Sequence, residues 1–246
     1  MLISIGKSAF EECSSLSSVT LPFNVSEIGD SAFQNCTGLK EINLSDMLIS
    51  IGKKAFKNCS SLEYLKIPRN VASLGSSAFK DCTGLKELTL AISLDASSSP
   101  GSGVWDGCKS IKKVNFTPGN GVGYDYGNAR GGGHNVSRTP WKISKDSLTT
   151  VIFEEGITHI GSYILYECDK ITSIVIPNTV TSIGESAFED CTSLTDISLP
   201  DSVKDIGEDA FKDCPGYQSV RLYSSCKMDA LVHSINEFRP ERTIVM

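Results

Sequence analysis

A 23-residue spacing between identical motifs constrains the fold of this chain more than any other feature of its sequence. Each copy contains Ile-Gly, or once Leu-Gly, and the copies begin at Ile5, Ile28, Ile51, Leu74, Ile160, Ile183 and Ile206. In six of these seven units Ala-Phe starts three residues after the glycine, and a cysteine lies three residues after the phenylalanine. Self-similarity at one fixed period predicts a solenoid, in which successive repeats stack along one axis.

A strand is expected near the end of each unit. The segment Leu-x-x-Val-x-Leu, as at 16–21, ends with apolar and polar residues in alternation, which indicates a strand with one buried face. Its central apolar residues form a ladder: Val19, Ile42, Leu65, Leu88, Val114, Val151, Ile174, Ile197 and Val220. The steps are 23 residues except for 26 before Val114 and 37 after it. We therefore expect nine parallel rungs in one array, without a second domain.

The remainder of the unit follows the same physical rules. The apolar pair Val25 and Ile28 suits a second short strand on another side of the coil. Pro22 has no N–H to donate and so ends the first strand. The segment Ser-Ala-Phe-x-x-Cys, as at 31–36, fits one tight helical turn with its phenylalanine and cysteine facing inward. No unit can bury its apolar residues alone, so stability is expected from stacking between neighbours.

The repeat pattern resembles that of a known family. The segment from Ile176 to Leu199 reads I-P-x-x-V-x-x-I-G-x-x-A-F-x-x-C-x-x-L-x-x-I-x-L, which is similar to the BspA-type leucine-rich repeat. The resemblance covers roughly residues 1–223, less an insertion at 119–147. It implies an α/β repeat solenoid, namely a right-handed leucine-rich-repeat superhelix with a parallel β-sheet on its concave side.

The resemblance also implies a function and a location. Members are commonly extracellular or cell-surface proteins implicated in adhesion, so the implied function is non-catalytic binding of a host or matrix protein. The family contributes no catalytic residues and no cofactor, and none is assigned to this chain. Met1 falls inside a repeat and no signal peptide precedes it, so we expect a trimmed chain.

The last 23 residues depart from the repeat. Met228, Leu231, Val232 and Ile235 have helical spacing and form one apolar face. The final coil of a solenoid needs its apolar side covered. We therefore divide the chain into a solenoid at 1–223, with its irregular insertion at 119–147, and a C-terminal capping segment at 224–246.

The sequence argues against a nucleic-acid partner and against insertion into a membrane. The net charge is −6, and lysine and arginine are not clustered, which disfavours nucleic acid. No stretch approaches the ~18 consecutive apolar residues of a membrane-spanning helix.

The residues that could carry chemistry are better explained by the repeat. Eight of the nine cysteines share one slot of the unit, which predicts buried, reduced thiols rather than a metal site. The ninth, Cys226, could pair with His233, but no third group is available to orient that pair. The glycine-rich stretch at 119–133 lacks the spacing of a phosphate-binding loop. An enzyme is therefore the least favoured of the functions considered.

Candidate binding residues come from the outward positions beside the ladder and from the insertion. Most outward positions are polar, such as Thr89 and Asn115, whereas Tyr64, Ile152 and Val175 are not. Exposed apolar or aromatic side chains on a sheet favour a recognition surface. The full set of candidates is Tyr64, Ile152 and Val175 on the sheet, with Tyr124, Tyr126 and His134 in the insertion.

Three alternatives stay open at this point. The array could be a passive spacer that projects another domain, in which case its outer face should be uniformly polar. The partner could be a glycan instead of a protein. The insertion could pack on the apolar positions merely to cover them.

Overall fold

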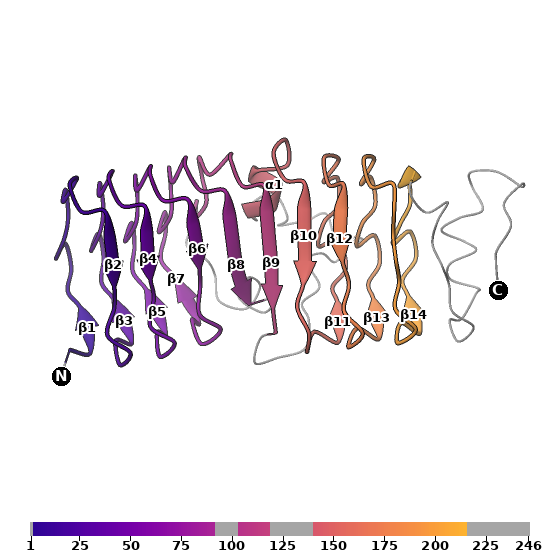
Figure 1. Ribbon diagram of the computed structural model, residues 1–246, viewed down its shortest axis with the longest axis horizontal. Helices are drawn as coiled ribbons and strands as arrows, with labels where there is room; N and C mark the ends of the chain where they lie inside the picture. Colours follow the sequence, from indigo (N-terminus) through magenta and orange to yellow (C-terminus); the bar gives the residue numbers. More distant parts are fainter. Residues whose placement is uncertain (1, 92–102, 119–139, 216–246) are drawn as a thin grey trace, which may run out of the picture.

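The protein is an elongated stack of coils whose rungs lie side by side along one axis (Figure 1). The computed structural model describes residues 2–91, 103–118 and 140–215. Two sets of short strands run along different sides of the stack. The predicted capping segment at 224–246 and the predicted rung at Val220 lie outside the described residues.

The rungs of the ladder form what we call the main sheet. They are β2 (Ser18–Thr20), β4 (Glu41–Asn43), β6 (Tyr64–Lys66), β8 (Glu87–Ala91), β9 (Lys113–Thr117), β10 (Thr150–Phe153) and β12 (Ser173–Val175). All described pairs are parallel, and the registers join equivalent residues of neighbouring units. Val114 pairs with Val151, so the coil with the insertion keeps the register expected from the ladder. This confirms the solenoid of parallel rungs.

The second set of strands lies at the Ile-Gly motifs. Its members are β1 (Ser4–Ile5), β3 (Glu27–Ile28), β5 (Ser50–Ile51) and β7 (Ser73–Leu74), then β11 (His159–Ile160), β13 (Ser182–Ile183) and β14 (Asp205–Ile206). They pair in parallel in two groups, β1-β3-β5-β7 and β11-β13-β14. In each two-residue strand the apolar residue faces the core, and the residue before it faces outward.

Helix is nearly absent from the described residues, which differs from the expected α/β class. The one described helix is α1 (Pro140–Ile143). The Ala-Phe segments are turns in which two residues of each coil take positive φ, as Ser31 (54°) and Asn35 (62°) do. The predicted helical turn is therefore wrong, because a residue with φ near +60° cannot continue a right-handed helix.

Phenylalanines fill the core as a continuous stack. The rings of Phe10, Phe33, Phe56, Phe79 and Trp105 lie face to face with centroids 4.9–5.2 Å apart. Phe33 and Phe56 have no exposed surface, whereas Phe10 at the first coil is 37% exposed. The end ring is exposed because no described coil precedes it, which shows that burial comes from neighbours.

The chain re-enters the stack after the insertion at Trp141 in α1. This residue is buried, and its ring meets Phe116 edge-on at 5.0 Å. The Ser144 hydroxyl donates to the Cys108 carbonyl, which ties the returning segment to the previous coil. Trp141 therefore anchors the returning segment in the core.

Candidate binding surface

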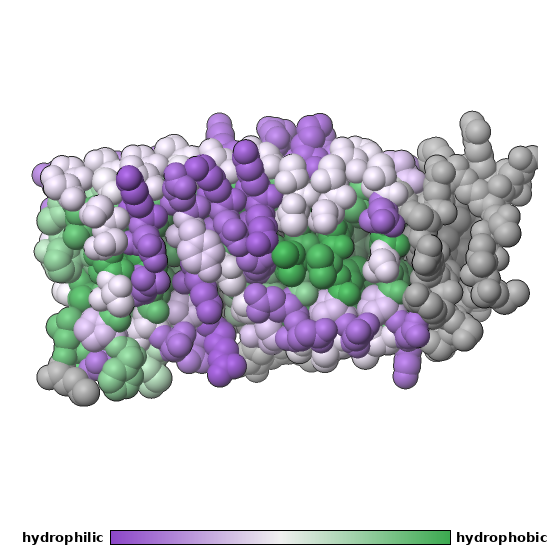
Figure 2. All heavy atoms as spheres, viewed as in Figure 1, coloured by the Kyte–Doolittle hydropathy of each residue, from purple (hydrophilic) through white to green (hydrophobic). Residues whose placement is uncertain are grey.

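The outer face of the main sheet differs between its two halves. Over β6, β8 and β9 it carries charged side chains, and the ion pairs Lys86–Glu63 and Lys113–Glu87 join neighbouring rungs at 2.9 Å. Tyr64 lies in this half and is 40% exposed, as predicted for an outward position. Over β10 and β12 the face is apolar (Figure 2).

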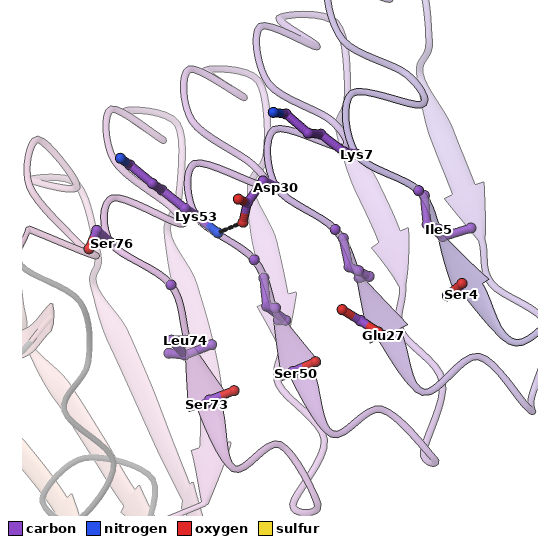
Figure 3. A pocket seen from close by; sticks show the side chains of 16 residues that line it. Ser4, Ile5, Lys7, Glu27, Asp30, Ser50, Lys53, Ser73, Leu74 and Ser76 are labelled. Carbon is purple, nitrogen blue, oxygen red and sulfur yellow. Dashed lines mark hydrogen bonds between the residues drawn. The ribbon is translucent and has the colours of Figure 1, made fainter.

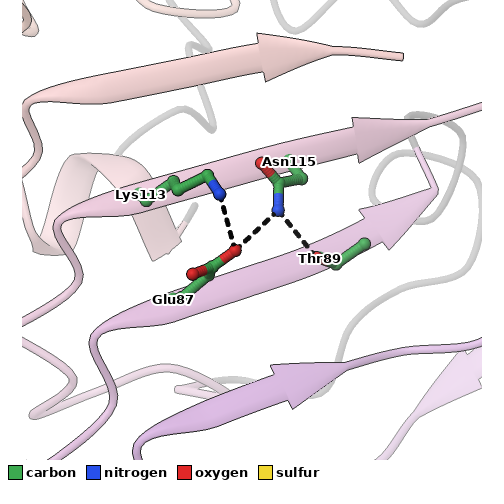
Figure 4. A network of polar contacts seen from close by, with 4 residues as sticks. All are labelled: Glu87, Thr89, Lys113 and Asn115. Atoms are coloured by element: carbon green, nitrogen blue, oxygen red, sulfur yellow. Dashed lines mark hydrogen bonds and ion pairs between the residues drawn. The ribbon is translucent and has the colours of Figure 1, made fainter. Parts of the chain in front are cut away.

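Two outward positions of the charged half are buried, which contradicts our expectation. Thr89 is 4% exposed and Asn115 is 9% exposed. The Asn115 amide donates to Thr89 Oγ1 (3.1 Å) and to Glu87 Oε1 (3.0 Å), and Lys113 Nζ donates to the same carboxylate (Figure 4). These short side chains are engaged with one another, so this part of the face offers few free polar groups.

The apolar half is centred on two residues predicted from the sequence. Ile152 on β10 pairs in register with Val175 on β12. Val175 is 47% exposed and Ile152 is half-buried. We call this pair the apolar strip; it forms part of the hydrophobic area over β10 and β12 in Figure 2. The structure thus brings together two of the six candidate residues.

A groove continues from the apolar strip toward the next coil. It has a volume of about 830 Å³ and is lined on one side by Ile174, Val175 and Ile176. The opposite side is formed by the segment 198–202. Period-two alternation places Ile174 and Ile176 inside, yet both are only partly buried. The sequence carries no signal for this groove, because its lining residues follow the same repeat pattern as other coils.

The other candidates do not join this surface. Tyr64 lies on β6, three rungs before β10 in the sheet order. Tyr124, Tyr126 and His134 of the insertion lie outside the described residues. Of the six candidate residues, the described surface therefore includes only the three on the main sheet.

A second groove crosses the strands at the Ile-Gly motifs (Figure 3). It has a volume of about 690 Å³ and spans β1, β3, β5 and β7. Its walls carry Ser4, Glu27, Ser50 and Ser73 on one side and Lys7, Asp30, Lys53 and Ser76 on the other, with glycines between them. The Asp30 carboxylate accepts a hydrogen bond from the Lys53 backbone N–H at 2.7 Å. The groove thus mixes hydroxyl groups with charges of both signs and contains no aromatic side chain.

The cysteines of the repeat are poorly suited to nucleophilic chemistry. Burial raises the pKa of the Cys36 thiol to about 11 and the pKa values of Cys59 and Cys168 to about 12. A thiol of this kind stays protonated at neutral pH, and the thiolate is the nucleophile. All eight described cysteines are free, and seven are buried. Cys13, on the first coil, is exposed, so our expectation that it is buried is wrong.

Other titratable groups serve structural contacts. His159 Nδ1 lies 2.8 Å from Ser182 Oγ, between equivalent positions of adjacent coils. The Tyr163 hydroxyl donates to Glu185 at 2.6 Å, and burial together with this hydrogen bond raises the pKa of Tyr163 to about 12. Within residues 2–91, 103–118 and 140–215, no group of three histidine, cysteine or acidic side chains could hold a metal ion.

Comparison with known proteins identifies the repeat. A family model described as "BspA type Leucine rich repeat region (6 copies)" matches residues 3–123 and 144–230. No curated protein matches the sequence. In the described part of the chain, no helix is long and apolar enough to cross a membrane.

The chain is also similar to solved structures of low sequence identity. A leucine-rich repeat protein from T. pallidum is 21% identical, with 94% of this chain and 76% of that chain covered and a TM-score of 0.44. A leucine rich cell surface protein from Faecalibacterium prausnitzii A2-165 is 25% identical, with coverages of 86% and 48% and a TM-score of 0.40.

Proposed function

Because the chain belongs to the BspA-type leucine-rich repeat family, whose repeat class commonly mediates protein interaction, we propose that it is a non-catalytic binding protein that recognises a host or matrix protein. The observation that carries this proposal is the apolar strip. A β-branched residue that is 47% exposed lies beside a second one on the neighbouring rung, whereas the other outward positions beside the ladder residues of the described main-sheet strands, apart from Tyr64, are polar. A passive spacer is expected to have a uniformly polar surface, since exposed apolar area favours association.

The wider proposal follows from the family resemblance. In it, the main sheet is the concave side of a right-handed superhelix at 1–223, and residues 224–246 cap the last coil. Tyr64, Tyr124, Tyr126 and His134 border the bound partner and add aromatic and polar contacts. The protein acts outside the cell or on the cell surface, without a cofactor and without nucleic acid as a partner.

Placing charges on the strip tests the proposal. We expect the double variant Ile152→Lys and Val175→Glu to bind at least about tenfold more weakly to a panel of purified, immobilised matrix glycoproteins, because burying an unpaired charge at an interface is costly. Surface plasmon resonance measures binding, and thermal unfolding measures stability. The matched control is Thr20→Lys with Asn43→Glu, which alters the equivalent positions of β2 and β4.

Three outcomes would contradict the proposal. If neither wild type nor variant binds any panel protein, the array is better described as a spacer. If the strip variant binds normally but melts at a lower temperature, the strip is a packing surface for another part of the chain. Loss of binding after enzymatic removal of glycans from the panel would assign recognition to a glycan.

A further inference from the structure

We propose that the groove beside β12 holds an extended segment of a protein partner, one with apolar side chains at alternate positions and basic residues at one end. This inference rests on the proposed function and names the chemistry of the partner. Three features of the described residues carry it: the groove between two coils, the apolar side chains that line it and the exposed acidic residues on the preceding coil.

The opening shows in the contacts of the main sheet. Among the described residues the five-stranded sheet ends at β12, and the following rung contributes only an isolated β-bridge residue, Ser198. On β6 and β10 the core residues are closed off: Leu65 and Val151 have no exposed surface and Phe153 is 1% exposed. Val19 on β2 and Leu44 beside β4 are only partly buried. On β12 the equivalent residues are only partly buried.

The hydroxyl group of Ser202, which lines the groove, lacks the contact between coils that its equivalent makes. Thr179 Oγ1 donates to the Ile157 carbonyl of the preceding coil at 2.8 Å. Ser202 occupies the equivalent position one coil later, and its buried Oγ has no hydrogen-bond partner in the described part of the chain. The contact between coils that Thr179 makes is thus missing at Ser202.

The two coils stay joined on their other side. There, β13 pairs with β14, and the Lys204 N–H donates to the Thr181 carbonyl at 2.9 Å. The coils therefore meet at the second set of strands, and the groove lies between them on the side of the main sheet. It adjoins the apolar strip, because Val175 lines it.

The lining selects an apolar occupant in an extended conformation. Ile174, Val175, Ile176, Leu199 and Pro200 supply the apolar walls. The space lies alongside β12, where an extended chain can place every second side chain into the groove. Burying apolar side chains in such a groove supplies affinity, while the extended backbone lies along the strand.

Acidic residues on the coil before the groove select the residues that flank the bound segment. Glu154 and Glu155 follow β10 directly and are exposed, and neither forms an ion pair within the described residues. Glu155 occupies, on the preceding coil, the position that Asn178 occupies at the groove. Lysine or arginine at one end of the bound segment would complement these carboxylates.

The test uses two fluorescein-labelled synthetic octapeptides. Both have six alternating valine and threonine residues, and they end in two lysines or in two glutamates. We expect the lysine peptide to bind about fivefold more tightly in fluorescence anisotropy at low salt, because exposed ion pairs contribute modestly. The preference should shrink in 0.5 M salt, because salt screens exposed charges and the screening length falls toward about 3 Å at high ionic strength. The double variant Glu154→Gln and Glu155→Gln should bind the two peptides equally.

Blocking the groove gives the second arm. Ser198 is exposed and lines the groove, so Ser198→Phe should fill it and weaken binding of the lysine peptide at least about tenfold. Thr20→Phe at the equivalent outward position of β2 is the control, and thermal unfolding verifies both variants. Equal binding of the two peptides to wild type, or unchanged binding to Ser198→Phe, would overturn the proposal. If Ser198→Phe still binds the matrix panel while the strip variant does not, the groove fails and the proposed function stands.

Discussion

The cysteine of each unit makes a specific contact between coils. The Cys59 thiol donates to the Phe33 carbonyl at 3.2 Å, and the Cys214 thiol donates to the Phe188 carbonyl at 2.9 Å. In both cases the phenylalanine belongs to the preceding coil, and the Phe33 carbonyl also accepts the N–H of Cys36. The repeated cysteine is thus both a small apolar filler and a hydrogen-bond donor that links one coil to the previous one.

These contacts predict which thiols react. In a Cys226→Ser background, we expect Ellman's reagent at pH 8 to modify Cys13 rapidly and the buried cysteines only after unfolding. Because burial raises the pKa values of Cys36 and Cys59 to about 11 and 12, raising the pH to 10 should still leave these thiols protonated and unreactive. The additional variant Cys13→Ser should abolish the fast phase. A fast phase that persists without Cys13 would show that the coils open readily.

Residue conformation in the turns could not be predicted from the sequence. Residues such as Ser8 and Glu12 adopt positive φ without being glycine, so nothing in their identity marks the left-handed region. Glycine takes the equivalent positions in one coil, at Gly103 and Gly107. The strained conformation is imposed by the contacts between stacked coils, such as the hydrogen bond from the Ser8 N–H to the Asp30 carbonyl at 2.9 Å.

At the scale of the element, five glycines that follow strands of the second set are required by the preceding coil: Gly29, Gly52, Gly75, Gly184 and Gly207. A Cβ atom on Gly52 would lie 2.6 Å from the Asp30 nitrogen, and one on Gly75 would lie 2.3 Å from the Lys53 nitrogen. Both contacts are with backbone, which cannot move aside easily. Nothing lies within 4 Å of a Cβ atom on Gly6, because no described coil precedes it.

This difference gives a prediction with an internal control. Gly52→Ala and Gly75→Ala should each lower the free energy of unfolding by about 1–3 kcal/mol, the usual cost of overpacking. Gly6→Ala should leave it unchanged within about 0.5 kcal/mol, as for an unconstrained surface position. Urea denaturation followed by circular dichroism measures all three. An equal loss at Gly6 would mean that backbone conformation, and not the neighbouring coil, makes glycine necessary.

The positions of the strands could be predicted from the sequence, whereas the burial of some of their side chains could not. Alternation located the rungs from β2 to β12 and correctly placed Val175 outward. It failed for Asn115, which is buried by contacts with the neighbouring rung, and for Ile174, which lines the groove and is only partly buried. Period-two alternation describes one strand, whereas burial also depends on the distance between strands.

Across the whole molecule, the aromatic core has two segments. Among the described residues, the face-to-face stack that starts at Phe10 ends at Trp105, which lies after the three-residue addition and before the fourteen-residue one. Beyond it, Phe116 stacks on Phe153 at 5.1 Å, and Phe153 meets Phe188 edge-on at 6.4 Å. Phe153, a residue of the main sheet, thereby contributes the aromatic ring to the core where Leu165 stands in place of the phenylalanine of the repeat. Each coil still contacts mainly its immediate neighbours.

Such an array should respond locally to the loss of one ring. Phe56→Ala removes a fully buried ring that stacks on two neighbours, so we expect a loss of about 3–5 kcal/mol of stability. Because repeat stability is a sum over neighbouring coils, hydrogen exchange should rise most between residues 28 and 91 and change little between 150 and 215. Phe188→Ala should show the opposite pattern, since its ring lies in the second segment. If both variants raise exchange uniformly along the chain, the solenoid unfolds as one unit and coupling extends well beyond adjacent coils.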